Sequence, residues 1–208
     1  MHMLAIRRST TGTNLDILDR MHRLRDKVFR ARLSWNVRCI DGREYDEFDR
    51  LDPTYLVART SRGELAGCVR MLPATGPTML GTVFPHLLLG RRLDAHGGMI
   101  ESSRFCVDTE IEEGRADGHL HRATMTMFAG IVEWCLINGY SELATATDIR
   151  LERILRRAGW SLRRLGHPTL INETRSIAGL LLIDRSTFER LRPEGYQSSF
   201  LRNRAEAA

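Results

Sequence analysis

The residues best suited to chemistry lie in one short stretch near the middle of the chain, residues 99–108. A carboxylate, two hydroxyls and a guanidinium follow one another there, at Glu101, Ser102, Ser103 and Arg104. A carboxylate can act as a general base, and a guanidinium binds a carboxylate or phosphate through its planar fork. The stretch therefore predicts a polar site. The alternative at this point is an edge strand whose Glu101 and Arg104 are solvated.

The composition of this stretch is typical of a β-strand. Ile100, Phe105 and Val107 are apolar or β-prone, and Gly97-Gly98 marks the start. A strand that served only a core would alternate apolar and polar side chains. Because this strand is polar at consecutive positions, both of its faces must meet polar groups.

The rest of the chain predicts helices and strands around this central strand. We expect strands at residues 3–7, 55–58, 65–71, 143–147, from Gly159-Trp160 onward and at 174–183, and helices from about residue 15, at 119–138, at 148–158 and after a Ser186 cap. The helix at 119–138 is apolar on most faces, which is typical of a buried helix. This order predicts an α/β fold with a mixed sheet in a three-layer αβα sandwich.

The chain length predicts a single domain over residues 1–208. Residues 32–53 show poor periodicity, several charges and a tryptophan, with a turn at Asp41-Gly42. Long loops in compact domains tend to be functional. We therefore expect residues 1–53 to form a partly mobile lid.

Composition limits the possible classes of protein. The formal net charge is +5, carried almost entirely by arginine, with Lys27 the only lysine. That charge indicates an anionic partner, but the basic residues are spread along the chain and form no nucleic-acid-binding motif. No apolar run is long enough to cross a bilayer and no signal peptide is evident, so we expect a cytoplasmic protein. The four cysteines form no C-x-x-C pair, which predicts reduced thiols and no metal site.

A strand that runs into a loop and then a buried helix resembles the N-acetyltransferase-like (GNAT-like) fold. The loop of that fold cradles a pyrophosphate through the pattern Arg/Gln-x-x-Gly-x-Gly/Ala. Here Arg115 and Gly118 match, and Leu120 stands where the second small residue would be. Backbone amides at a helix N-terminus favour a phosphate, so a phosphopantetheine arm fits this loop. The alternative is an ordinary polar turn.

A second resemblance rests on charged and aromatic residues spaced along the chain. They are Arg25, Phe29, Trp35, Asp46, Asp49, Arg70, Glu101, Arg104 and Phe105. The amino-acid sequences of residues 67–73, 101–105 and 157–160 carry the same resemblance. From about residue 21 to residue 160 and beyond, the chain resembles the LuxI family of acyl-homoserine-lactone synthases. It is nearest to the TraI-like branch, which makes 3-oxo-acyl signals of medium length.

The resemblance implies a quorum-sensing enzyme that acylates the α-amine of S-adenosylmethionine. The acyl donor is a thioester, usually on acyl carrier protein and otherwise on coenzyme A, and lactonisation then expels methylthioadenosine. S-adenosylmethionine is a substrate, so we expect no cofactor and no metal. Its carboxylate, amine, sulfonium and adenine need both signs of charge and an aromatic wall.

The residues suit these tasks. We expect positive groups from Arg25, Arg70 and Arg104, and negative groups from Asp46 and Asp49. The aromatic wall is predicted at Phe29, Trp35 and Phe84, with Phe105 also in contact with S-adenosylmethionine.

The predicted catalytic residues are Glu101, Ser103 and Arg104. Glu101 is the candidate base that deprotonates the amine. Backbone amides from Ser103 to Phe105 are the candidate donors to the tetrahedral oxyanion.

We expect the acyl chain to lie in an apolar slot lined by Ser103, Met127, Phe128, Leu143 and Thr145. Thr145 matches a family threonine that accompanies 3-oxo chains, where a hydroxyl could hydrogen-bond the β-keto oxygen. Thr145 could equally be an ordinary β-branched strand residue.

Arg150, Arg153 and Arg157 fall on one face of the predicted helix at residues 148–158. Because acyl carrier proteins are acidic, we expect this face to be their dock. The alternative is a solvated arginine face.

Taken singly, each assignment has a structural alternative. Asp46 and Asp49 could be solvated loop carboxylates, Arg25 and Arg70 structural ion-pair partners, and Trp35 a core residue. Two other functions stay open: an acetyl-coenzyme A-dependent N-acetyltransferase, and a catalytically silent module that binds nucleic acid or a nucleotide.

Overall fold

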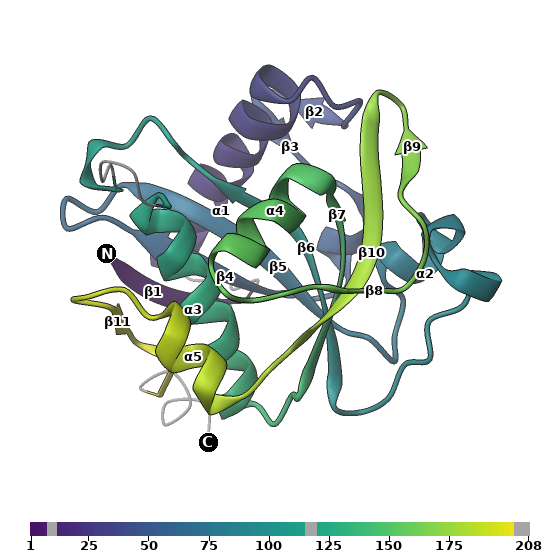
Figure 1. The fold of residues 1–208 in the computed structure, drawn as a ribbon. Helices are drawn as coiled ribbons and strands as arrows, with labels where there is room; N and C mark the ends of the chain where they lie inside the picture. Colours follow the sequence, from purple (N-terminus) through teal and green to yellow (C-terminus); the bar gives the residue numbers. More distant parts are fainter. Residues whose placement is uncertain (8–11, 115–119, 202–208) are drawn as a thin grey trace. The chain divides into compact units, whose positions relative to one another are not determined.

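The computed structural model describes residues 1–7, 12–114 and 120–201 (Figure 1). The chain divides into two compact units, each assembled from distant segments. The first unit comprises Met1–Arg70, Arg104–Gly130 and Pro193–Ala208. The second unit comprises Met71–Ser103 and Ile131–Arg192. Three elements, β5 (Leu65–Pro73), β6 (Met99–Val107) and α3 (Arg122–Ile137), contribute residues to both units.

The first unit combines a sheet edge with the first long helix. Besides its parts of β5, β6 and α3, it contains β1 (His2–Ile6), α1 (Gly12–Arg25), a π-helix (Asp26–Arg32), β2 (Cys39–Ile40), β3 (Arg43–Glu44), a 3₁₀ helix (Glu47–Arg50), β4 (Thr54–Arg59), a 3₁₀ turn (Glu112–Gly114) and β11 (Gln197–Ser198). Its strands run in the order β11-β1-β4-β5. The β1–β4 pair is antiparallel and the β1–β11 pair is parallel.

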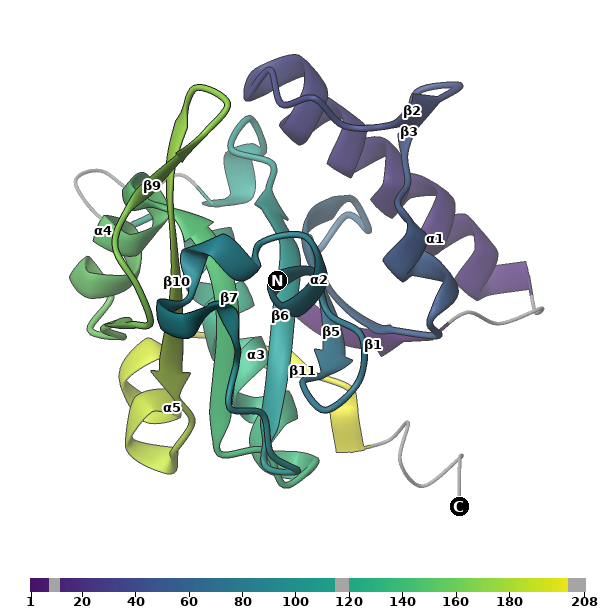
Figure 2. The same cartoon turned by 90° about the vertical axis from the view of Figure 1, so that its right-hand side faces the viewer.

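The apolar face of α1 and of the π-helix builds the core of the first unit. Met21, Leu24 and Phe29 are buried against Val57 of β4 and Cys68 of β5. Burial of each such side chain contributes roughly 1.5–3 kcal/mol. The β2–β3 hairpin contacts α1 (Figures 1 and 2), so the segment after the helix folds back onto it.

The second unit carries the remainder of the mixed sheet. Besides its parts of β5, β6 and α3, it contains α2 (Met79–Thr82), two 3₁₀ turns (Pro85–Leu87 and Leu89–Arg91), β7 (Glu142–Asp148), α4 (Ile149–Arg157), β8 (Arg163–Arg164), β9 (Thr169–Ile171), β10 (Thr174–Leu182) and α5 (Arg185–Leu191). Its strands run β6-β7-β10-β8, and β9 also pairs with β10. β6 and β7 are parallel, whereas β7 and β10 are antiparallel. The predicted α/β class with a mixed sheet is confirmed.

Two local predictions are wrong in their boundaries. The strand predicted to start at Gly159-Trp160 begins only at Arg163, as β8, because Gly159, with a φ of 82°, follows α4 in the left-handed region that glycine tolerates. The last helix is capped by Asp184 rather than Ser186, because Asp184 Oδ1 accepts a hydrogen bond of 2.7 Å from the Thr187 amide. Ser186 donates its own hydroxyl to the same Asp184 oxygen at 2.7 Å.

The predicted lid segment contains helices and short strands. The turn at Asp41-Gly42 is confirmed, with φ values of 50° and 73° between β2 and β3. Asp46 and Asp49 then form a capping box around the 3₁₀ helix. Mobility of the lid and the single-domain assignment stay predictions.

The cysteines and the helices bear on the predictions of reduced thiols and of no membrane span. All four cysteines are free, and Cys68, Cys106 and Cys135 are buried. In the part of the chain that the structure describes, no helix has the length and apolar character that a membrane span requires.

Candidate functional site

Six charged side chains form one network in the first unit. They come from α1, β3, the 3₁₀ helix and its cap, β5 and β6, and they are Arg25, Glu44, Asp46, Asp49, Arg70 and Arg104. The sequence predicted five of them as a group. The structure therefore brings together the arginines of the predicted substrate site and both of its aspartates.

Arg25 is completely buried on α1. Its Nε donates to Glu44 Oε2 at 2.5 Å, while Nη1 and Nη2 donate to the two oxygens of Asp49 at 2.8 and 3.0 Å. The bidentate contact between Arg25 and Asp49 holds the guanidinium and the carboxylate in one plane. Arg25 thus links the helix to β3 and to the 3₁₀ helix.

Arg70, also fully buried, makes the second bidentate contact. Its Nη1 donates to Asp46 Oδ1 and, at 2.9 Å, to Asp49 Oδ1, and its Nη2 donates to Asp46 Oδ2 at 2.9 Å. Arg104 completes the network, with Nε at 3.0 Å from Glu44 Oε1 and Nη2 at 2.9 Å from Asp46 Oδ2. Each carboxylate is therefore shared by two arginines.

The network balances three positive charges with three negative charges. Isolated buried charges would be strongly destabilising, and pairing with good hydrogen-bond geometry offsets that cost. Asp46 and Asp49 are therefore not solvated loop carboxylates. Arg25 and Arg70 do form the ion pairs that the structural alternative expected, and these pairs bring them beside Asp46 and Asp49.

The electrostatics of the network keep Asp49 ionised. Burial alone would raise the pKa of this carboxyl, but the hydrogen bond and charge of Arg25, the charge of Arg70 and the Tyr55 hydroxyl hold the pKa far below its ordinary value. Tyr55 donates to Asp49 Oδ1 at 2.6 Å. Burial and the Asp49 charge raise the pKa of Tyr55, so this phenol stays a hydrogen-bond donor.

Aromatic rings border the network. The Arg104 guanidinium lies 5.7 Å from the centroid of the Phe29 ring, and the Arg70 guanidinium lies 5.4 Å from the Phe48 ring. Phe29 stacks on Trp35 with centroids 5.2 Å apart and an interplanar angle of 11°. Two residues of the predicted aromatic wall are thus in contact. Trp35 also packs against the core of this unit, as its structural alternative expected.

The backbone at Arg104 is unusual for a strand. Its φ of 55° lies in the left-handed region, although Arg104 is part of β6. Such a conformation costs a non-glycine residue roughly 1–2 kcal/mol. The ion pairs of Arg104 with Glu44 and Asp46 stabilise the side chain in this position.

Sequence reasoning missed Glu44, His22 and Tyr55. Glu44 is fully buried and bridges Arg25 and Arg104. The His22 Nδ1–H donates to the Glu44 carbonyl at 2.8 Å, and its ring lies 4.1 Å from that of Tyr45. Burial and the Arg25 charge lower the pKa of His22, which keeps the imidazole neutral. In the sequence alone, no signal separates Glu44 from the other carboxylates of its charged segment.

Glu101, the predicted base, belongs to the second unit and is buried. Its Oε1 accepts a hydrogen bond of 3.0 Å from the Met79 amide, and its Oε2 accepts one of 2.7 Å from the Leu80 amide. Both donors lie in the first turn of α2, where backbone amides have no partner within the helix. These two hydrogen bonds fix the orientation of the Glu101 carboxylate.

The other predicted aromatic residues pack locally. Phe84, half-buried, packs against the apolar core of the second unit and lies edge-on to His86. Phe105 stacks on Phe128 in the first unit, with centroids 5.4 Å apart.

The predicted acyl-chain residues are mostly buried. Met127 and Phe128 are buried in the first unit and Leu143 in the second, whereas Ser103 is partly exposed. Thr145 is also buried, and its hydroxyl donates to the Ser102 carbonyl at 3.1 Å. A role for these residues in holding an acyl chain stays a prediction.

The predicted dock residues Arg150, Arg153 and Arg157 are exposed on α4. Within residues 1–7, 12–114 and 120–201, none of the three forms an ion pair. Of the predicted phosphate loop, Arg115 to Leu120, residues 115–119 lie outside the described residues.

The chain is similar to known proteins along almost its full length. Residues 10–191 match the family model described as autoinducer synthase. An acyl-homoserine-lactone synthase of Agrobacterium fabrum is 56% identical over 181 residues, which is 87% of this chain and 86% of that protein.

Solved structures are also similar to this chain. A structure described as the coenzyme A-dependent acyl-homoserine lactone synthase BjaI, with SAM and isopentyl-CoA, has a TM-score of 0.80 and 27% identity over 99% of both chains. An acyl-CoA N-acyltransferase from Pseudomonas aeruginosa, 16% identical, has a TM-score of 0.55 over 86% of this chain and 97% of its own. This second likeness concerns the fold alone, and it confirms the GNAT-like fold class. The chain belongs to the autoinducer synthase family, and it is an acyltransferase of the acyl-homoserine-lactone synthase class, which acts in quorum sensing.

Proposed function

We propose that the protein acylates the α-amine of S-adenosylmethionine with an acyl thioester and then closes the lactone, releasing methylthioadenosine. The observation that carries this proposal is the balanced network of three arginines and three carboxylates in the first unit. A zwitterionic amino acid needs both signs of charge at fixed positions, and this network presents both. BjaI, a structural relative, was solved with S-adenosylmethionine.

The network and its aromatic border suit the parts of this substrate. The substrate carboxylate would pair with a guanidinium such as that of Arg104, and the amine would lie near Asp46 or Asp49. The stacked rings of Phe29 and Trp35 offer a π-face to the sulfonium and the adenine. Phe84 and Phe105 are proposed as further contacts.

Acyl transfer requires a neutral amine. We assign Glu101 as the base that takes the proton, directly or through one water, and the amides from Ser103 to Phe105 as donors to the oxyanion. The amine forms the new amide bond while the thiol of the donor leaves. In the second step the substrate carboxylate attacks the carbon bound to the sulfonium, and methylthioadenosine leaves from that carbon.

The direct experiment is to incubate the purified chain with S-adenosylmethionine and a panel of acyl thioesters, on carrier protein and on coenzyme A. The lactones are identified by mass spectrometry. An acylated but unlactonised product from acetyl-coenzyme A alone would instead favour a plain N-acetyltransferase. Absence of any acylated product would overturn the proposal.

We infer that the donor is an acyl carrier protein that docks on Arg150, Arg153 and Arg157. The support is that these arginines are exposed on one helix without carboxylate partners among the described residues. Since BjaI is described as coenzyme A-dependent, both donors must be compared. Charge reversal at Arg153 and Arg157 should raise the KM for the carrier-bound donor more than that for the coenzyme A thioester. Equal effects on the two donors would contradict a protein dock.

We also propose a 3-oxo acyl chain of medium length, as in the TraI-like branch. The Thr145 hydroxyl donates to the Ser102 carbonyl at 3.1 Å, so it must exchange this partner for the β-keto oxygen when the chain binds. Thr145→Val should lower the ratio of 3-oxo to unsubstituted lactone, whereas Thr145→Ser should retain it. An unchanged ratio in Thr145→Val would remove Thr145 from this role.

The reaction as proposed uses no metal and no cofactor and takes place in the cytoplasm. Both partners in the chemistry are substrates, and the leaving groups are already activated. Activity should therefore persist after exhaustive dialysis against EDTA, measured as lactone formed per minute. Loss of activity that a divalent cation restores would contradict this part of the proposal.

A further inference from the structure

A cavity of about 380 Å³ lies in the second unit, and arginines dominate its lining. Arg153 and Arg156 come from α4, Arg164 from β8 and Arg175 from β10. α4 contacts β10, and in two perpendicular views α4 lies beside the β9–β10 hairpin (Figures 1 and 2). Four arginines from three separate elements thus line one cavity.

Only one of these arginines is neutralised nearby. Arg164 donates from Nε and Nη2 to the two oxygens of Glu152 at 2.6 and 2.8 Å. This hydrogen bond holds the pKa of Glu152 below its usual value, so Glu152 stays ionised. Among the residues that the structure describes, Arg153, Arg156 and Arg175 have no ion-pair partner.

The cavity therefore has an excess of positive charge. Four arginines against one glutamate leave a formal excess of three positive charges around it. Like charges that face one another repel, and an anion in the cavity would relieve this repulsion. A cationic ligand would be repelled by such a lining.

The volume of the cavity and its other lining residues indicate which class of ligand would fit. Ile149 and Leu162 give the cavity apolar walls, and Ser161 adds a hydroxyl. The volume is at the lower end of the range for small-molecule sites, roughly 300–1,000 Å³. A guanidinium fork matches the oxygens of a phosphate, and one phosphate can accept hydrogen bonds from several guanidinium groups at once.

We propose that this cavity binds the phosphate group of a phosphorylated organic molecule, with the organic part against Ile149 and Leu162. The site is distinct from the proposed carrier-protein dock. On α4, residues 149, 152, 153 and 156 face the cavity, whereas the dock lies on the neighbouring face and shares only Arg153 with it.

Two sources could supply this phosphate. One is the acyl donor itself, since both phosphopantetheine and coenzyme A carry phosphates; this source rests on the proposed function. The other is a free phosphorylated metabolite that modulates the enzyme. The chemistry of recognition is the same for both.

The binding test uses inorganic pyrophosphate as the probe, titrated by calorimetry into the full chain at fixed ionic strength. Arg156→Gln and Arg175→Gln should each weaken binding by about tenfold, because each loses a charge-assisted contact. Arg175→Lys keeps the charge but loses the fork, and should fall between the wild type and Arg175→Gln. Circular dichroism checks that the variants fold.

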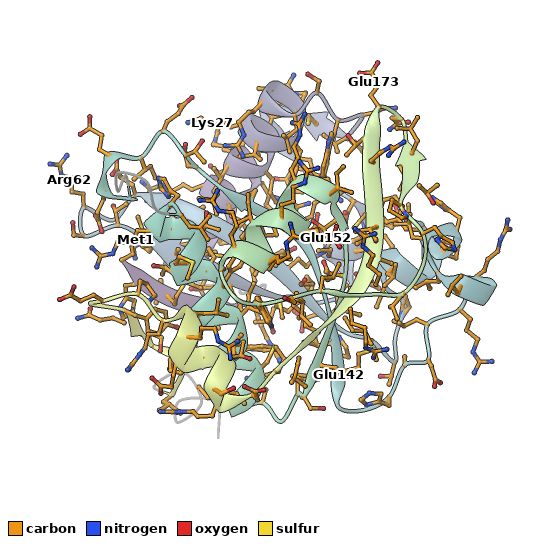
Figure 3. The ribbon with its side chains drawn as sticks, viewed as in Figure 1. Met1, Lys27, Arg62, Glu142, Glu152 and Glu173 are labelled. Atoms are coloured by element: carbon orange, nitrogen blue, oxygen red, sulfur yellow. The ribbon has the colours of Figure 1, made fainter. Side chains whose placement is uncertain are left out.

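The matched control is Arg62→Gln, which removes an exposed arginine from the turn between β4 and β5 (Figure 3). It should bind pyrophosphate as the wild type does. Equal weakening in Arg62→Gln, Arg156→Gln and Arg175→Gln would mean that net charge alone attracts an adventitious ion, and the proposal would be overturned. Absence of pyrophosphate binding to the wild type would overturn it as well.

A second arm distinguishes the two sources. If the acyl donor supplies the phosphate, pyrophosphate raises the donor KM without changing kcat, and Arg156→Gln abolishes that effect. If a separate metabolite supplies the phosphate, pyrophosphate changes kcat and leaves the donor KM unchanged. Arg156→Gln should abolish this effect too. Pyrophosphate binding does not require lactone synthesis, so failure of the proposed function and failure of this site would be seen separately.

Discussion

At the scale of single residues, the charged network depends on Glu44. Its two carboxylate oxygens accept from Arg25 and from Arg104, and its backbone carbonyl accepts from His22. Glu44 thus connects Arg25 of α1 directly to Arg104 of β6. Glu44 is therefore the side chain on which the relative positions of Arg25 and Arg104 depend.

We predict that Glu44→Gln destabilises the protein by about 3 kcal/mol, since it leaves buried arginine charge without its partner. Binding of S-adenosylmethionine should weaken in parallel. Urea unfolding and calorimetry would measure the two effects. Glu47→Gln, at an exposed position three residues away, is the control and should change neither. A fully stable Glu44→Gln would mean that the network is not held by this carboxylate.

Asp49 makes stability depend on pH. Its pKa is lower in the folded state than in the unfolded chain, because Arg25, Arg70 and Tyr55 stabilise the carboxylate. A carboxyl of this kind contributes stability above its unfolded pKa, and that contribution is lost as the pH falls towards the folded value. The free energy of unfolding should therefore decrease below about pH 4.

Urea unfolding of the wild type and of Asp49→Asn between pH 7 and pH 3 checks this prediction. The variant should be less stable at pH 7 and should show a shallower dependence on acid. Parallel curves for the two proteins would show that Asp49 is not responsible.

The sequence predicted Arg25, Asp46, Asp49, Arg70 and Arg104 as one group because their types and spacing are distinctive. It did not predict Glu44. A single glutamate in a charged segment is indistinguishable from a solvated one until the β2–β3 hairpin folds back onto α1 and buries it.

At the scale of elements, one close approach holds the segment after α4 in place. A Cβ added at Gly166 would lie 2.2 Å from the Leu87 carbonyl oxygen, and Leu89 N donates to the Leu165 carbonyl at 2.9 Å. The chain before β9 is thus packed directly against the 3₁₀ turns after α2.

We predict that Gly166→Ala costs about 1–3 kcal/mol, because a backbone atom rather than a flexible side chain blocks the added methyl group. Thermal unfolding followed by circular dichroism would detect the loss. Gly97→Ala is the matched control, since nothing lies within 4 Å of its added Cβ. If both variants unfolded at the same temperature, the close approach would not exist in solution.

Element prediction succeeded where periodicity or capping is strong. The β4–β5 hairpin, β6, α3 and α4 all occur where the patterns placed them. β9 and β11, of three and two residues, were not predicted, because so few residues carry no periodic signal. Trp160 was predicted to begin a strand, but it lies before β8, and its indole N–H donates to the Leu182 carbonyl at 2.9 Å.

At the scale of the whole molecule, the alternation of elements predicted the α/β class with a mixed sheet. The division of the chain into two compact units could not be predicted, because it depends on which distant segments contact one another. The excess of arginine also has a structural explanation: some of it is neutralised in the buried network, and some surrounds the cavity beside α4.

The central claim is that this chain couples acyl transfer onto S-adenosylmethionine to release of methylthioadenosine, and that the charged network binds the sulfonium substrate. The most direct test is to quantify lactone and methylthioadenosine by mass spectrometry from one reaction of the full chain with a medium-chain acyl thioester. We predict equal amounts of the two products, and a fall of both by about 100-fold or more in Asp46→Asn, which removes the charge that Arg70 and Arg104 share. Acyl transfer without methylthioadenosine, or wild-type yields from Asp46→Asn, would contradict this account.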